Sequence, residues 1–210
     1  MALNAGLKKR VAIFALGMLA ALAAHRSDRE PSPHRSRAPQ RWMTVTADAS
    51  NLPDRIESAD VSVTYVIENV ECLKPLLVSG AHRRGVHIED VVPERMSTNQ
   101  FNARIPLDAF QEEDYDGLGA CRWRLSIVAF RLNAENHSFD ASVAGPVVER
   151  KDSYTIYYSA SSIAHAAPRQ VIRGLGIPSA LSPAPGEEIY QAVLSTKGTA
   201  DRTAPMASRP

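Results

Sequence analysis

The sequence GLGACRWRLSIVAFRL (residues 117–132) is the most strand-like run of the chain, and it contains one of the two cysteines. Its side chains alternate between two faces, as they do in a β-strand. One face begins with Arg122 and Arg124 and becomes apolar at Val128 and Phe130. The opposite face carries Cys121, Trp123, Leu125, Ile127 and Ala129. We predict a strand with Cys121 in the core beside Trp123, half-buried at first and then buried on both faces or covered by a loop.

Six further short runs of alternating or apolar residues are separated by turn residues such as Gly, Pro, Asn and Asp. They cover residues 42–46, 60–70, 85–92, 99–105, 139–143 and 153–158. About seven short strands, with no long helical period between them, are typical of an all-β protein. We predict an immunoglobulin-like β-sandwich of two packed sheets over residues 42–167.

Two of these runs alternate clearly enough to assign residues to faces. In the run 85–92, Val86 and Ile88 share one face, and His87 and Glu89 share the other. In the run 60–70 the polar residues of one face oppose four apolar or aromatic residues, which are Val61, Val63, Tyr65 and Ile67.

The first residues of the chain have the layout of a secretory signal peptide. A basic segment, KKR at residues 8–10, precedes an apolar run at residues 11–24, and Ala21-Leu22-Ala23 offers the small residues that signal peptidase needs. The run is short for a membrane span, which needs about 20 apolar residues. We expect residues 1–23 to be a cleaved signal peptide or, alternatively, an N-terminal anchor in the inner membrane. The protein is then periplasmic or secreted.

Pro, Ser, Gly and Arg dominate the segments on either side of the predicted sandwich. Segments that bury so little apolar surface cannot offset their conformational entropy. We expect residues 24–41 to be a disordered linker and residues 168–210 to be a flexible Pro/Gly-rich tail. One short helix near residues 187–194 is the exception within that tail.

The two cysteines of an exported chain usually form a disulfide. We predict that Cys72 and Cys121 are paired, which closes a loop of about 50 residues and stabilises the fold by roughly 4 kcal/mol in the chain-entropy model. No CxxC pattern indicates a redox site. The order of Cys72, Cys121 and a core Trp resembles an immunoglobulin-type sandwich, although Trp123 follows the second cysteine instead of lying between the pair.

The charge of the predicted sandwich argues against one class of partner. Residues 42–167 contain 11 basic and 18 acidic side chains, although the whole chain has a net charge of +1. Phosphate binding requires a basic surface, so nucleic acid is a poor partner. We expect another protein as the partner, and contact with a membrane only if the N-terminal segment stays uncleaved.

Two regions are candidates for binding that protein partner. The first is the acidic loop EEDYDG, which crowds four carboxylates before a glycine, and the second is the tyrosine-rich end of the last predicted strand. Exposed tyrosine is enriched at protein interfaces. The residues of the two regions are Glu112, Glu113, Asp114, Tyr115, Asp116, Tyr154, Tyr157 and Tyr158. A solvated acidic turn, a partial calcium loop and ordinary core packing of the tyrosines are the alternatives.

Motifs that would indicate catalysis are missing from the sequence. It contains no GxSxG, no HExxH and no regular spacing of histidines, and its GLG tripeptides are too short for a phosphate-binding loop. We therefore predict no catalytic residues, no metal site and no cofactor. A pair of carboxylates suited to glycoside hydrolysis remains open, because their spacing is three-dimensional.

Two segments resemble poorly characterised exported proteins of plant- and soil-associated proteobacteria, which carry an "EN…C.P" segment and a "DYxGxGxCxW" segment. The matching residues are Glu68, Asn69, Cys72, Pro75, Asp114, Tyr115, Gly117, Gly119, Cys121 and Trp123. Some of those proteins occur beside secretion-system toxins, and the resemblance therefore implies a periplasmic immunity role.

Together these features predict an exported, non-catalytic, protein-binding module of the bacterial envelope. The alternatives are a small secreted hydrolase and an envelope structural protein without a dedicated partner.

Overall fold

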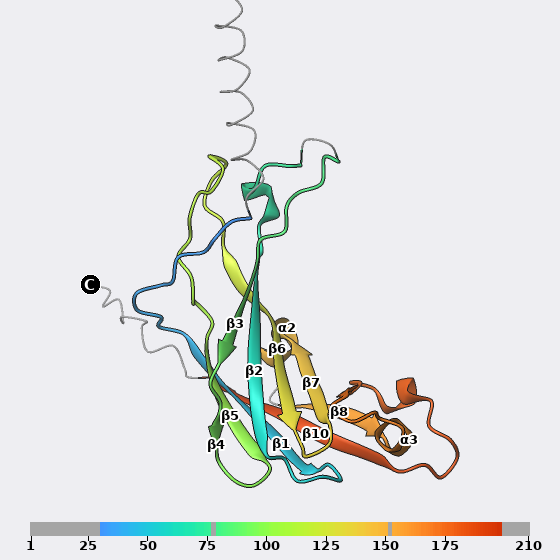
Figure 1. Cartoon of the computed structure of the whole chain (residues 1–210). Coiled ribbons are helices and arrows are strands. Elements are labelled where there is room, and N and C mark those ends of the chain that lie inside the picture. Colours follow the sequence, from blue (N-terminus) through green and yellow to red (C-terminus); the bar gives the residue numbers. More distant parts are fainter. Residues whose placement is uncertain (1–29, 77–78, 151–152, 199–210) are drawn as a thin grey trace, which may run out of the picture.

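The computed structural model describes residues 30–76, 79–150 and 153–198 (Figure 1). The predicted leader at residues 1–23 lies outside this part of the chain. Among the described residues, no helix combines the length and the apolar character needed to cross a bilayer.

Ten strands form two five-stranded sheets in the described part of the chain, which confirms the predicted two-sheet β-sandwich. The first sheet has the order β4 (Glu94–Arg95), β5 (Gln100–Pro106), β1 (Trp42–Asn51), β10 (Ile189–Gly198) and β8 (Ser153–Ser159). The second has the order β3 (Val86–Val91), β2 (Ser58–Ile67), β6 (Trp123–Asn133), β7 (Ser138–Ala144) and β9 (Val171–Arg173). All strand pairs are antiparallel except β7 and β9. Among the described residues, short helices occupy four connections: η1 (Val70–Cys72), α2 (Gly145–Val148), α3 (Ala160–Ala164) and η2 (Pro178–Leu181).

The core lies between the sheets and is built from alternate residues of each strand. In β2 the apolar residues assigned to one face are buried, as the alternation predicts. In β5 the buried residues include Phe101, Ala103 and Ile105. The hydroxyl of Tyr65 donates a hydrogen bond of 2.7 Å to the carbonyl of Pro106 and thereby links the two sheets. Burial raises the pKa of Tyr65, so the hydroxyl stays protonated and keeps this bond.

Strand β6 changes face at a bulge, which explains its irregular alternation. Its register against β2 shifts between Leu125 and Ile127, and Ser126 is left without a partner. Leu125 is buried before the bulge, and Val128 and Phe130 are buried after it. Ile127 consequently points outward with 42% of its surface exposed, and its predicted place on the face of Cys121 is wrong.

The C-terminal segment is part of the sandwich, and the predicted boundary at residue 167 is wrong. Strand β10 lies between β1 and β8 and pairs with both, and β9 pairs with β7. In β10, Ala192 and Leu194 are buried. The predicted helix at residues 187–194 is therefore replaced by a strand. The outer face of the run mixes polar residues with Val193, and Pro and Gly precede the run, so its local composition resembles a tail. Long-range pairing with two strands stabilises it as a strand.

Residues 30–41, which we call the strap, pack against the sandwich, so the expected disordered linker does not extend over them (Figure 1). The Ser36 amide donates to the Ala109 carbonyl at 2.8 Å, and the carboxylate of Asp108 accepts from the amides of Gln40 and Arg41. These bonds join segments about 70 residues apart, and no local pattern in the strap reveals them.

The first prediction tests the role of the C-terminal strands. A chain that ends at Ala167 lacks β9 and β10, so β1 and β8 lose their common neighbour. We expect this chain to show no cooperative thermal unfolding by circular dichroism. A chain that ends at Gly198 retains every described strand and should unfold cooperatively. Cooperative unfolding of the shorter chain would show that β10 is dispensable.

Candidate functional site: the disulfide end

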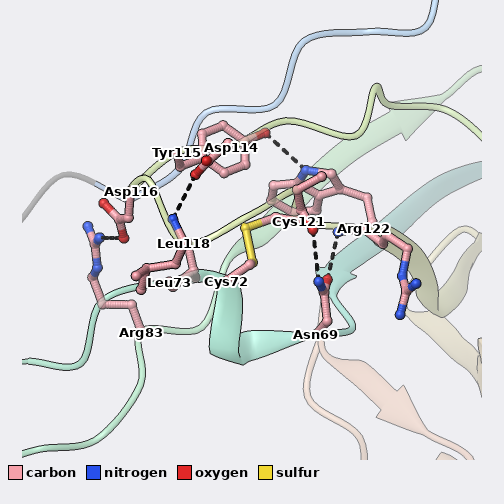
Figure 2. Close-up of a disulfide and its surroundings, with 12 residues drawn as sticks. Asn69, Cys72, Leu73, Arg83, Asp114, Tyr115, Asp116, Leu118, Cys121 and Arg122 are labelled. Carbon is pink, nitrogen blue, oxygen red and sulfur yellow. Dashed lines mark hydrogen bonds and ion pairs between the residues drawn. A yellow bond between two sulfur atoms is a disulfide. The ribbon is translucent and has the colours of Figure 1, made fainter.

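The predicted disulfide is present and lies at one end of the second sheet (Figure 2). Cys72 is in η1, directly after β2, and Cys121 precedes β6, so the bond extends the β2–β6 pair. The two Cα atoms are 5.4 Å apart. Both cysteines are buried with Ile67 and Leu73 in a small second core. The bond therefore ties neighbouring strands of one sheet, unlike the disulfide between sheets in immunoglobulin domains.

The side chain of Asn69 continues the β2–β6 pairing beyond the last residues of the strands. Its Nδ2 donates to the Ala120 carbonyl at 2.9 Å, and its Oδ1 accepts from the Arg122 amide at 2.7 Å (Figure 2). The Glu68 amide donates to the Arg122 carbonyl at 2.9 Å. One amide side chain thus satisfies a donor and an acceptor of the opposing backbone, which orients the residues on either side of Cys121.

The acidic loop uses two of its carboxylates to hold its own conformation. Asp114 accepts hydrogen bonds from the amides of Gly117 and Leu118 at 2.6 and 3.1 Å. Gly117 and Gly119 have φ angles of 77° and 107°, a region that favours glycine. Asp116 accepts from the Lys74 amide at 2.7 Å and forms an ion pair with Arg83 (Figure 2).

The Asp116–Arg83 ion pair is largely shielded from solvent, with side chains 12% and 9% exposed. Burial by itself raises the pKa of the Asp116 carboxyl. The hydrogen bonds from Lys74 and Arg83, together with their positive charges, outweigh burial and lower this pKa below its ordinary value. Asp116 is therefore a structural anion that joins the acidic loop to the segment around Arg83.

The remaining residues of the acidic loop differ in their accessibility. Glu113 accepts hydrogen bonds from Nδ1 of His34 in the strap, at 2.8 and 2.9 Å. The hydroxyl of Tyr115 accepts a hydrogen bond of 3.1 Å from the indole of Trp123. Burial is the main cause of the raised pKa of Tyr115. Glu112 alone among the predicted acidic residues lines the cleft described below.

The three predicted tyrosines lie elsewhere, on β8 at the edge of the first sheet. Figure 1 shows β8 far from the disulfide end, so the two predicted regions do not form one surface. Tyr158 is 1% exposed and donates to the Asp140 carbonyl at 3.0 Å, so it belongs to the core. Tyr154 and Tyr157 are half-buried. Tyr157 also exchanges two backbone hydrogen bonds with Leu175, which partly covers this edge.

A cleft of about 400 Å³ opens at the disulfide end. Its lining comes from five segments that the sandwich brings together: the last residue of the strap, the residue after β2, the segment after β5, the start of β6, and α2 with the residue that follows it. Phe110 and Trp123 contribute its aromatic part, with ring centroids 5.7 Å apart. The hydrogen bond from Trp123 to Tyr115 fixes the indole from the side of the acidic loop.

Charged side chains of both signs surround this aromatic pair. The basic ones are Arg41, Arg122 and Arg124, and the acidic ones are Glu68, Asp108, Glu112 and Glu149. Asp108 is occupied by the two strap amides. Within the described part of the chain, the other six side chains have no hydrogen bond or ion pair. Charges arranged in a concave surface without internal partners are available to a ligand from outside.

The sequence contained a signal for only some of the cleft residues. Arg122 and Arg124 follow the cysteine on the polar face of the predicted strand, next to an aromatic residue. Glu68 belongs to the EN…C.P segment of the resemblance. Arg41 and Glu149 have no signal, because they come from distant segments that meet the others only through the sheet pairing and α2. Among the described residues, no group of three or more metal-ligating side chains is found.

No family model matches the chain, and no curated protein or solved structure matches it. The disulfide by itself indicates an oxidising compartment, such as the periplasm or the extracellular space.

The second prediction concerns the disulfide. The Cys72→Ser, Cys121→Ser double variant should lose about 4 kcal/mol of unfolding free energy, because a loop of 49 residues is no longer closed in the unfolded chain. Denaturant unfolding measures this difference. The wild-type protein under reducing conditions is the matched comparison, and it should lose a similar amount. Equal stability of the oxidised wild type and the double variant would contradict the prediction.

The third prediction concerns the buried ion pair. Asp116→Asn leaves Arg83 without its counter-charge and should cost about 3 kcal/mol of unfolding free energy at neutral pH. Because the folded-state pKa of Asp116 is lowered, its contribution is complete above the ordinary value of 3.8 and is lost as the pH falls through the lower folded value. The difference between wild type and variant should therefore shrink below about pH 4.

Chemical denaturation at a series of pH values measures that difference. Glu71→Gln, at an exposed position, is the control and should leave the profile unchanged. A gap between wild type and Asp116→Asn that is independent of pH would show that the ionisation of Asp116 does not stabilise the fold.

Proposed function

We propose that this protein is an exported, non-catalytic, protein-binding module of the bacterial envelope, and that it contacts its partner through the cleft at the disulfide end. The observation that supports this proposal is the convergence of Trp123 and three arginines without internal partners around one concave surface. Tryptophan and arginine are the residues most enriched among those that dominate binding energy at protein interfaces.

The cleft is held rigid before any partner binds. Trp123 is fixed by the Tyr115 hydroxyl and by contact with Phe110, and Arg122 has its backbone hydrogen-bonded to Asn69 and Glu68. The disulfide closes the base of the same segment. An indole that is already fixed loses little entropy on binding, so contacts to Trp123 convert efficiently into affinity.

Both signs of charge around the cleft favour a partner whose contact surface is also of mixed charge. The arginines suit carboxylates, which a guanidinium can bind with two parallel hydrogen bonds. The glutamates suit lysine or arginine of the partner. Such complementary pairs accelerate association and make it sensitive to salt.

Export is supported by the disulfide and by the signal-peptide layout of the first residues. An immunity-type inhibitor of a toxin is the specific role implied by the sequence resemblance at the disulfide end. The structure offers an explanation for those shared residues: Asn69, Asp114 and Tyr115 hold the backbone or Trp123 in place. These three residues support the cleft, whereas the shared residues Glu68 and Trp123 line it.

The fourth prediction tests the cleft. In a pull-down from the periplasm, the products of adjacent genes are immobilised as bait. One of them should capture this protein. The Arg122→Ala, Arg124→Ala double variant should weaken that complex by tenfold or more, because hot-spot arginines contribute above 1 kcal/mol each. Titration calorimetry with that bait protein measures the dissociation constant.

Arg131→Ala is the matched control, since this exposed arginine lies at the other end of the same strand. The control should bind as the wild type does. Equal loss in both variants would mean that general charge, and not the cleft, carries the binding. Hydrolytic activity of the purified protein that disappears in Glu112→Gln would favour the enzyme alternative instead.

A further inference from the structure

The free edge of β3 is the least protected sheet edge in the described part of the chain. The edge strands β4 and β9 have two and three residues, and β8 is partly covered by the two hydrogen bonds between Tyr157 and Leu175. β3 has six residues and no described backbone partner on its outer side. Lysine, proline and bulges usually block such edges, and β3 contains none of these three. Its inward-pointing charge, Glu89, is already neutralised by Arg35 of the strap.

Two of the three residues on the outward face of β3 are apolar, and the third is Asp90. Ile88 is 62% exposed and Val86 is 40% exposed, whereas His87 and Glu89 face the interior. His87 packs against Phe110 with ring centroids 4.9 Å apart, and Glu89 pairs with Arg35 of the strap. The register places Ile88 beside Thr64, and Thr64 beside the exposed Ile127. A row of two isoleucines with Thr64 between them thus runs to the edge of the sheet.

The backbone groups that β3 presents outward follow from its pairing with β2. The Ile67 amide donates to the Gly85 carbonyl at 3.0 Å. In an antiparallel pair the hydrogen-bonded residues alternate, so His87 and Glu89 direct their amide and carbonyl groups toward β2. Val86, Ile88 and Asp90 therefore direct theirs away from the sheet.

We propose that two copies of this protein pair their β3 strands antiparallel, with the two-fold axis at Ile88. Ile88 then exchanges two backbone hydrogen bonds with the partner's Ile88, and Val86 does the same with the partner's Asp90. All the groups needed for this register already point outward. The second sheet of one copy and the second sheet of the other then form one continuous sheet. The row from Ile127 through Thr64 to Ile88 continues into the second copy.

The charges of the strand select this register over its neighbour. With the axis at Ile88, His87 lies opposite the partner's Glu89, and no two carboxylates face each other. With the axis at Glu89, two carboxylates lie directly opposite one another, which destabilises a strand pair. A shift by one residue places the outward-directed backbone groups of one copy opposite residues whose groups point toward β2, so the hydrogen bonds between the copies cannot form. Self-complementarity at Ile88 therefore favours a second copy of this chain as the occupant of the edge.

Analytical ultracentrifugation of the mature protein tests the dimer. Wild type should sediment with twice the mass of one chain at micromolar concentrations. Ile88→Lys places two ammonium groups at the axis, and its side chain is exposed in the single copy, so the variant should fold and sediment as a monomer. Val92→Lys is the matched control: Val92 is 93% exposed, lies just outside β3, and should leave the dimer intact.

The register has its own test, made after the native disulfide has formed. A short bis-maleimide should cross-link Ile88→Cys into covalent dimers, because paired Cα atoms lie about 5.5 Å apart. Val92→Cys should not cross-link, since eight residues of extended chain separate the two thiols along the strand pair by about 27 Å. A monomeric wild type, a dimeric Ile88→Lys, or cross-linking at Val92 instead of Ile88 would each overturn the proposal.

Discussion

The disulfide between Cys72 and Cys121 is the constraint on which the structure of the disulfide end depends. It lies directly beyond the β2–β6 pair, the central pair of the second sheet, and Asn69 extends the same pairing with its side chain. The covalent bond and the amide together hold the start of β6 in register. Trp123 and the arginines beside it therefore occupy defined positions, although they lie next to long loops.

Charge at this end of the molecule is divided between two roles. Asp114 and Asp116 stabilise the loop itself: Asp114 accepts hydrogen bonds from backbone amides, and Asp116 forms the ion pair with Arg83. The side chains of Arg41, Arg122 and Arg124 have no such internal partner among the described residues. Acidic clusters are thus poor guides to a binding surface when short-range backbone donors satisfy them. The cleft, where unsatisfied charges meet an aromatic pair, is the stronger candidate.

The cleft and the β3 edge are separate surfaces of one scaffold. The cleft is lined by charged side chains around Trp123, whereas the edge is apolar and offers backbone hydrogen bonds. The strap contacts both regions, since Asp108 holds its end and Arg35 pairs with Glu89. A dimer through β3 would leave the side chains of Arg122 and Arg124 unpaired, so one assembly would carry two copies of the cleft.

Local patterns in the sequence determined most of the strands and the inward faces of β2 and β5, because alternation is a property of neighbouring residues. The cysteine pair followed from the signal-peptide layout of the first residues and from the presence of two cysteines. Tertiary structure alone decided the rest. β10 is a strand only because β1 and β8 flank it, and the strap is ordered only because Ala109 and Asp108 receive its amides. The bulge at Ser126 turns Ile127 outward, and the cleft exists only where five distant segments meet. Long-range pairing leaves no periodic trace in the sequence, which is the physical reason for this division.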